Sequence, residues 1–160
     1  MNNDPIALLV ADLFEAAGVF RHAGEAIAAA EGQTQARWQL LSVVSDQPRT
    51  VPQAARRLGV TRQAVQRVAN DLIGAALLKA EPNPDHRTST LLSLTLPGRA
   101  TLHRLSERAL QLNQPLSQAV SLRDIAATRR TLQALINDIR HSDTADDNSP
   151  QAHSSKRRST

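Results

Sequence analysis

Residues 50–70 read TVPQAARRLGVTRQAVQRVAN, and this stretch decides the fold. Ala55 is a small residue at a position where two helices must approach closely, and Gly59 lies where the chain turns sharply. Val65 is a β-branched residue that packs between the two helices. Together they have the spacing of a helix-turn-helix motif. We therefore expect two short helices joined by a tight turn.

Capping signals indicate where these two helices begin and end. Thr50, followed three residues later by Gln53, forms a capping-box pattern, which predicts a helix over 51–58 that ends at the glycine. Thr61 can cap a second helix that continues to about Ala75.

The second helix separates into an apolar and a polar face when its residues are placed at 100° intervals. The apolar face consists of Ala64, Val65, Val68, Ala69 and Leu72, and the polar face of Arg62, Gln63, Gln66, Arg67 and Asn70. Arg can bond bidentately to guanine, and Gln or Asn to adenine, in the major groove of DNA. No carboxylate precedes Asp71 on this helix, so the pattern favours a DNA-reading face over an ordinary solvated one.

A turn cluster follows the second helix. Residues 79–90 read KAEPNPDHRTST, after which Leu92, Leu94 and Leu96 alternate with Ser93 and Thr95. Period-two alternation after a Pro/Asn/Asp cluster predicts a two-stranded hairpin, a wing beside the helix pair.

The tip of this wing carries a histidine and an arginine next to a carboxylate. His86 and Arg87 can lie over the minor groove, where the negative potential attracts a guanidinium. Asp85 either holds Arg87 or caps the turn, or it is an unpaired carboxylate in solvent.

Residues 54–68, the Asp85-His86-Arg87 wing and the run Leu94-Thr95-Leu96-Pro97-Gly98 resemble the multiple-antibiotic-resistance-regulator (MarR) family, and the resemblance covers nearly the whole chain. It implies a mainly α fold with a small β-wing, an obligate homodimer, and usually transcriptional repression from a pseudo-palindromic operator in double-stranded DNA. Residues expected to contact DNA are Thr50, Thr61, Arg62, Gln63, Gln66, Arg67, Asn70, Asp85, His86 and Arg87.

The flanking segments complete the expected organisation. We expect an N-terminal dimerisation helix in residues 1–30, which carry an apolar stripe from Ile6 to Phe20. The winged helix-turn-helix lobe is expected over residues 31–99. A long connecting helix and a C-terminal dimerisation helix are expected over residues 100–141. The connecting helix is expected from Gly98 to about Val120, with a kink near Pro115. Ser121 and Asp124 form a capping-box pattern that opens the last helix. The alternative is a monomer whose stripes pack on its own lobe.

The last segment, 142–160, has few apolar residues and is expected to be a disordered tail.

Composition and charge fit this organisation. The chain has 160 residues, 41% hydrophobic and 21% charged, with no Cys, so thiol-based sensing is excluded. Residues 49–104 hold nine Lys or Arg against three Asp or Glu, whereas residues 1–48 hold two against six, which places the basic charge on the lobe. Without a bilayer-spanning run or a leader sequence, we expect a cytoplasmic protein that does not enter the membrane.

A small aromatic or anionic effector is a further expectation from the family. Arg21, His22, Arg37 and Trp38 could line a crevice, with a cation for a carboxylate and the indole for a ring. Trp38, the sole tryptophan, is expected to pack in the core, and a wall of this crevice is the alternative. A ligand that changes the roughly 34 Å separation of two recognition helices would weaken DNA binding.

Other function classes find little support in the residues. The five His are scattered, which disfavours a metal site, and no cofactor is expected. The chain has no Gly-rich phosphate loop or nucleophile elbow, so we expect no enzyme. Two alternatives stay open: a sequence-nonspecific architectural DNA-binding protein, and a winged-helix module that binds proteins.

Overall fold

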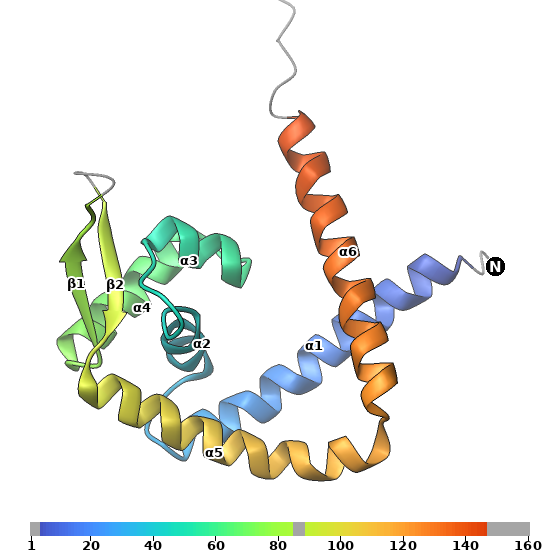
Figure 1. Ribbon diagram of the computed structural model, residues 1–160, viewed down its shortest axis with the longest axis horizontal. Helices are drawn as coiled ribbons and strands as arrows, with labels where there is room; N and C mark the ends of the chain where they lie inside the picture. The colour runs from blue at the N-terminus through green and yellow to red at the C-terminus, as the bar shows by residue number, and fades with distance from the viewer. Residues whose placement is uncertain (1–3, 85–88, 147–160) are drawn as a thin grey trace, which may run out of the picture. The chain divides into compact units, whose positions relative to one another are not determined.

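The computed structural model describes residues 4–84 and 89–146, the last five as backbone only. They divide into two compact units, residues 1–113 and 114–160, which we describe separately. Six helices and one two-stranded sheet follow the order α1 (Pro5–Ala29), α2 (Gln35–Val43), α3 (Val51–Leu58), α4 (Arg62–Gly74), β1 (Leu78–Pro82), β2 (Thr90–Leu94), α5 (Leu96–Ala119) and α6 (Leu122–Asp146) (Figure 1).

The helix-turn-helix forms where its capping signals predict. Thr50 and Gln53 make the complete capping box. The backbone N–H of Gln53 donates to the Thr50 hydroxyl oxygen, and the backbone N–H of Thr50 donates to Gln53 Oε1 at 2.9 Å. Gly59 ends α3 in the left-handed conformation with a φ of 68°, which glycine adopts at little cost. Thr61 accepts from the Ala64 amide at 3.2 Å and begins α4.

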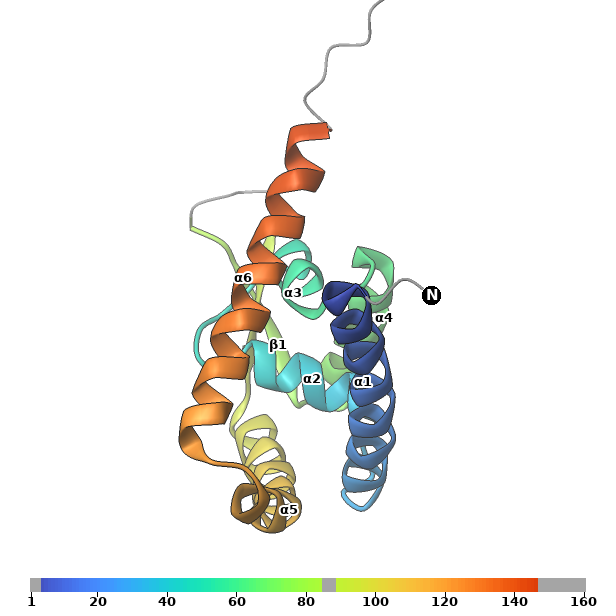
Figure 2. The same cartoon turned by 90° about the vertical axis from the view of Figure 1, so that its right-hand side faces the viewer.

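An aliphatic core holds the lobe together. Leu40 and Leu41 of α2, Val65 and Leu72 of α4 and Leu105 of α5 are all at most 2% exposed. Helix α2 packs against α1, α3 and α4, and α3 also packs against α4. Figures 1 and 2 both show the C-terminal end of α1 beside α2.

The wing is an antiparallel hairpin in which Leu78 pairs with Leu94 and Pro82 with Thr90. The chain just before α3 joins its edge: the Arg49 amide donates to the Leu92 carbonyl at 3.1 Å, and the Leu92 amide donates to the Arg49 carbonyl at 2.8 Å. This bridge fixes the hairpin to the start of the helix-turn-helix.

One face of the hairpin carries a polar cluster around Ser93. Although it alternates with leucines along β2, Ser93 is itself buried, at 7% exposed. Its hydroxyl donates to Glu81 Oε2 at 2.7 Å, and Lys79 pairs with Glu81 Oε1 at 2.6 Å. Ser93 and Glu81 are diagonal cross-strand neighbours, so the longer side chains cover the short one.

Helix α5 begins at Leu96, two residues earlier than predicted, and Leu96 is therefore not part of the strand alternation. The Thr95 hydroxyl lies 2.7 Å from the Ala76 carbonyl and 3.1 Å from that of Leu77, and it accepts from the Gly98 amide at 3.0 Å. Thr95 thus caps α5 and attaches it to the turn before β1. Leu96 is 81% exposed as a consequence.

An ion-pair cluster fixes the turn after α1 to α5. Glu31, whose side chain is 12% exposed, accepts from Arg104 Nε at 2.8 Å and from Arg108 Nε at 2.5 Å. The hydrogen bonds from Arg108 and Arg104, with their charges, hold the pKa of Glu31 below its ordinary value.

The N-terminal part of α1 leaves its apolar side chains exposed. Phe14 is 77% exposed and Phe20 59% exposed, and the buried residues of this helix, Gly24 and Ala28, lie near its C-terminal end.

The second unit contains the end of α5 and all of α6. Ser121 accepts from the Asp124 amide at 3.1 Å and donates to its carboxylate, so α6 begins at the predicted position. Leu122 and Ile139 are 83% and 62% exposed. Helix α6 continues to Asp146, which corrects the expected start of the tail at residue 142; the rest of that tail lies outside the described residues.

Pro115 lies inside α5, close to where the two units divide, and provides no backbone N–H to this helix. None of the helices in the described ranges is both long and apolar enough to cross a membrane.

Candidate nucleic-acid interface

Helix α4 has the two faces that its sequence predicts. Val65, Ala69 and Leu72 are buried, and Ala64 and Val68 are half-buried. The polar residues of the opposite face are all exposed: Arg62, Gln63, Gln66, Arg67 and Asn70.

These five polar residues share an open groove with the start of α3. Val51 and Pro52, at the N-terminus of α3, form its other wall, and the groove measures about 540 Å³. The N-terminal end of α3 and the length of α4 are therefore presented on one surface. A groove of this kind can receive a strand of a nucleic-acid backbone beside the polar face.

Two of the groove residues are hydrogen-bonded to each other. Gln66 Nε2 donates to Asn70 Oδ1 at 2.9 Å, across one turn of α4. The contact occupies one Gln66 hydrogen and the Asn70 carbonyl oxygen. The Gln66 carbonyl oxygen and the Asn70 amino group are not used by it.

The two threonines of the predicted contact set act as helix caps. Thr50 is 8% exposed and holds the first turn of α3, so it does not line the groove. Thr61 is exposed and caps α4. Asp85, His86 and Arg87 lie outside the described residues, in the segment that joins the two wing strands.

Positive charge dominates the helix pair. Arg56 and Arg57 occupy the last turn of α3, and Arg62 and Arg67 are on α4, whereas Asp71 is the first carboxylate after Thr50. The N-terminus of α4 adds the partial positive charge of a helix dipole. In the wing, hydrogen bonds from Lys79 and Ser93 lower the pKa of Glu81, so this carboxylate is ionised and paired.

Two of the four predicted effector residues share a groove between α1 and α2. Arg21 and His22 line an open groove of about 500 Å³ with Glu25, which brings a carboxylate into it. Arg37 and Trp38 do not line this groove. Trp38 packs against the aliphatic core, and Arg37 Nε is buried without a hydrogen-bond partner among the described residues.

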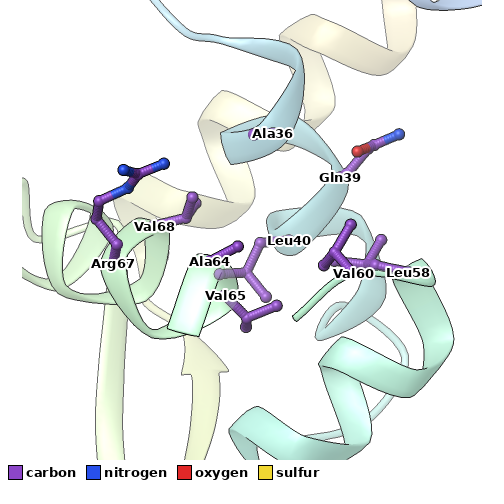
Figure 3. A pocket seen from close by; sticks show the side chains of 9 residues that line it. All are labelled: Ala36, Gln39, Leu40, Leu58, Val60, Ala64, Val65, Arg67 and Val68. Carbon is purple, nitrogen blue, oxygen red and sulfur yellow. The ribbon is translucent and has the colours of Figure 1, made fainter. Parts of the chain in front are cut away.

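A smaller apolar pocket lies between α2 and α4 and was not predicted. Its volume is about 120 Å³, and Figure 3 shows Leu40, Val60 and Val65 around its centre. Gln39 and Arg67 are its polar lining residues, and both side chains extend away from the aliphatic group (Figure 3). Arg67 lines both this pocket and the groove beside α3.

Comparison with known proteins identifies the family. A family model described as MarR family matches residues 31–87, from the turn before α2 into the segment that follows β1. The chain is 60% identical to the uncharacterized protein Rv2011c of Mycobacterium tuberculosis over 134 residues. This match covers 84% of this chain and 94% of Rv2011c. An uncharacterized protein of Mycobacterium bovis, Mb2034c, matches equally well. The chain belongs to the MarR family.

Solved MarR structures share this fold. CouR from Rhodococcus jostii, solved bound to p-coumaroyl-CoA, has a TM-score of 0.73 at 18% identity and covers 83% of this chain and 92% of its own. Mycobacterium tuberculosis Rv2887, solved in complex with p-aminosalicylic acid, has a TM-score of 0.63 at 23% identity, covering 79% and 97%. AbsC from Streptomyces coelicolor has a TM-score of 0.74 at 14% identity, covering 88% and 98%. The predicted fold, mainly α with a small β-wing, is confirmed.

MarR family regulators are DNA-binding transcription factors that act as dimers. For this MarR chain, sequence reasoning named the α4 side of the groove but missed Val51 and Pro52. Their position after a capping threonine placed them at a helix N-terminus, which would have been enough to include them. No signal pointed to the pocket behind α4, because it depends on how α2 packs against α4.

Among the described residues, no three His, Asp or Glu side chains come close enough to hold a metal ion.

Proposed function

We propose that this MarR chain is a sequence-specific transcriptional repressor, which binds a pseudo-palindromic operator as a homodimer and is released by a small-molecule effector. The observation that carries the proposal is the groove in which Arg62, Gln63, Gln66, Arg67 and Asn70 of α4 stand opposite the N-terminus of α3.

The residue types on α4 match the edges of DNA bases. Arg62 can bond bidentately to the O6 and N7 atoms of guanine, and Gln66 can bond to the N6 and N7 atoms of adenine. Arg57 and the N-termini of α3 and α4 suit phosphate contacts, which position the helix without reading sequence. A helix of this kind enters the major groove with its N-terminal residues toward the bases.

The wing supplies the second contact in this proposal. Strand β1 ends at Pro82 and strand β2 begins at Thr90, and Arg87 lies in the segment between them. We propose that Arg87 enters the minor groove, with His86 and Asp85 beside it.

Homodimerisation is supported by apolar side chains that the chain does not cover itself. Phe14 and Phe20 on α1, and Leu122 and Ile139 on α6, are each more than half exposed. Exposed apolar surface of this extent is typical of an interface. Two recognition helices about 34 Å apart would then read successive major grooves on one side of the duplex.

Effector release is supported by the apolar pocket behind α4 and by the relatives. The ligands in the CouR and Rv2887 structures both contain an aromatic ring. Cavities of roughly 150 Å³ hold a benzene ring, close to the volume of this pocket. Arg67 lines both this pocket and the groove proposed for DNA, and its guanidinium points away from the aliphatic lining (Figure 3). An anionic ring compound that draws this guanidinium toward the pocket would therefore compete with DNA for it. The groove at Arg21 and His22 is the other candidate site.

The experiment that tests DNA recognition is a selection of binding sites from random duplex DNA with the purified full-length chain. Affinity for the selected duplex and for a scrambled one is then measured between 50 and 200 mM salt, a range over which phosphate contacts lose about 10³-fold in affinity or more. Half-sites about ten base pairs apart support the proposal. Tight, salt-dependent binding without an enriched sequence would indicate an architectural protein, and no binding would favour a protein partner.

The effector proposal is tested by titrating benzoate into the complex with the selected duplex at constant ionic strength. Val60→Phe fills the apolar pocket from the α3–α4 turn, and Arg21→Ala removes the cation of the other groove. Loss of benzoate sensitivity in Val60→Phe alone, with unchanged affinity for DNA without benzoate, supports the pocket behind α4. Loss in Arg21→Ala alone would assign the effector to the groove between α1 and α2.

A further inference from the structure

The hydrogen bond between Gln66 and Asn70 determines which amide atoms α4 offers to a partner. Gln66 Nε2 donates to Asn70 Oδ1 at 2.9 Å, and both residues are exposed in the groove beside α3. Asn70 Oδ1 and one Gln66 hydrogen are therefore engaged within the helix. Gln66 Oε1, an acceptor, and the second Gln66 hydrogen stay available.

We propose that Asn70 is a positioning residue, which fixes the orientation of the Gln66 amide so that Gln66 accepts adenine and rejects guanine at one base pair of each half-site. The inference rests on the proposed function, because it assigns a specificity role within the same DNA-reading face.

Base chemistry explains the discrimination. Adenine presents the N7 acceptor and the N6 donor in the major groove, whereas guanine presents two acceptors, N7 and O6. An amide held with its oxygen toward the N6 position receives a hydrogen bond from adenine but places oxygen against oxygen when guanine is there. If the Gln66 amide turned over, its nitrogen would donate to guanine O6 instead. The hydrogen bond to Asn70 opposes rotation of Gln66 alone, because that rotation would bring Gln66 Oε1 against Asn70 Oδ1. The contact re-forms only if both amides turn over together, so the guanine-accepting arrangement requires two coupled rotations.

The position of Asn70 along α4 favours a role through Gln66 over a base contact of its own. At a rise of 1.5 Å per residue, Gln66 lies about 6 Å and Asn70 about 12 Å along the axis from Arg62, the first residue of the helix. Recognition helices of this class contact base edges with their N-terminal residues. Asn70 also has the shorter side chain, so Gln66 is better placed to reach a base.

The stability of the fold does not depend on this contact. A Gln–Asn pair on an exposed helix surface contributes little to helix stability, and Ala has a higher helix propensity than Asn. Asn70→Ala is therefore expected to fold normally, and its effect on base preference can be measured without a change in structure.

The experiment compares wild type, Gln66→Ala, Asn70→Ala and Asn70→Asp on the selected operator and on duplexes that carry each base at every half-site position. We expect Gln66→Ala to identify one position at which wild type prefers adenine to guanine by about 5- to 150-fold, the range for a bidentate contact. Asn70→Ala should reduce that ratio at least about five-fold at the same position. Asn70→Asp keeps an acceptor for Gln66, so it should retain the adenine preference while its charge weakens binding to all duplexes.

Gln63→Ala is the matched control, since it removes another exposed amide from the same face. Gln63 is itself an expected DNA contact, so this variant should lose affinity but keep the wild-type ratio at the Gln66 position. The inference is overturned if Asn70→Ala keeps the wild-type ratio, if Asn70→Asp loses it as fully as Asn70→Ala does, or if wild type prefers guanine there. A wild-type chain without any base preference would overturn the proposed function itself, which the wild-type measurement reveals before any variant is tested.

Discussion

The carbonyl oxygen of Leu77 occupies the place where any residue other than glycine at position 98 would carry its β-carbon. The approach arises because Thr95 draws the first turn of α5 onto the turn before β1 through its contacts with Ala76, Leu77 and Gly98. The Leu-Thr-x-x-Gly run at 94–98 thus has a physical reason: the threonine makes the joint and the glycine leaves room for it.

Replacing Gly98 by Ala should destabilise the lobe. The added carbon meets a backbone atom that cannot move aside alone, so we expect the free energy of unfolding to fall by about 1–3 kcal/mol. Thermal unfolding followed by circular dichroism measures the effect. Gly74→Ala is the matched control, because a β-carbon there meets nothing within 4 Å; it should gain up to about 1 kcal/mol. Equal melting temperatures for the two variants would contradict this account of the joint.

The Glu31 cluster should make stability depend on pH in the acidic range. Because Arg108 and Arg104 lower the pKa of Glu31 in the folded chain, its contribution is complete above the unfolded pKa, about 4.3. The contribution is lost as pH falls through the lower folded pKa. Wild type should therefore exceed Glu31→Gln in unfolding free energy at pH 7, and the difference should disappear on acidification below about pH 4.

Urea unfolding at a series of pH values measures this difference. Glu107→Gln is the control. It removes an exposed carboxylate from α5, the helix that carries Arg104 and Arg108, and it should follow the wild-type pH dependence. A constant gap between wild type and Glu31→Gln at every pH would show that the ion pairs are not its source.

Arg62→Ala should weaken binding to the preferred operator by about 1–3 kcal/mol and relax the base preference at one position. Arg62→Lys retains the charge but not the planar fork, so it should recover affinity for all duplexes without recovering the preference. Fluorescence anisotropy with the single-base panel separates the two effects. An unchanged preference in Arg62→Ala would remove this residue from the reading face.

Arg87→Ala should reduce affinity most for operators whose flanks are A/T-rich, since a narrow minor groove concentrates negative potential. The test compares variant and wild type on duplexes that differ only in those flanks. An equal loss on all of them would mean that Arg87 contacts phosphate alone.

The helix-turn-helix could be predicted from sequence because its determinants are local. A capping threonine, a glutamine three residues later and a glycine with positive φ specify α3 without reference to the rest of the chain. The start of α5 could not be predicted in this way. It depends on the hydroxyl of Thr95 meeting carbonyl groups 18 and 19 residues away, which no periodicity records.

The four predicted effector residues lie in different surroundings because rotation along a helix separates sequence neighbours. Gln35, Ala36 and Gln39 of α2 line the groove with Arg21 and His22, while Trp38 turns toward the core. Successive residues differ by 100° around a helix, so adjacency to a groove residue does not predict membership of the groove. From sequence, core packing is the interpretation of Trp38 and a pocket wall the alternative, and the structure has Trp38 packed against the core.

The position of Trp38 has a practical consequence for spectroscopy. Trp38 is the sole tryptophan, and the chain has no tyrosine. It lies on α2, the helix that lines both the apolar pocket behind α4 and the groove at Arg21 and His22. Near-ultraviolet emission from the unlabelled protein therefore originates at a single known point, half-buried between solvent and core. Trp38 is therefore a native fluorescent probe. Because the chain has no cysteine, a single introduced cysteine can be labelled specifically with a second fluorophore.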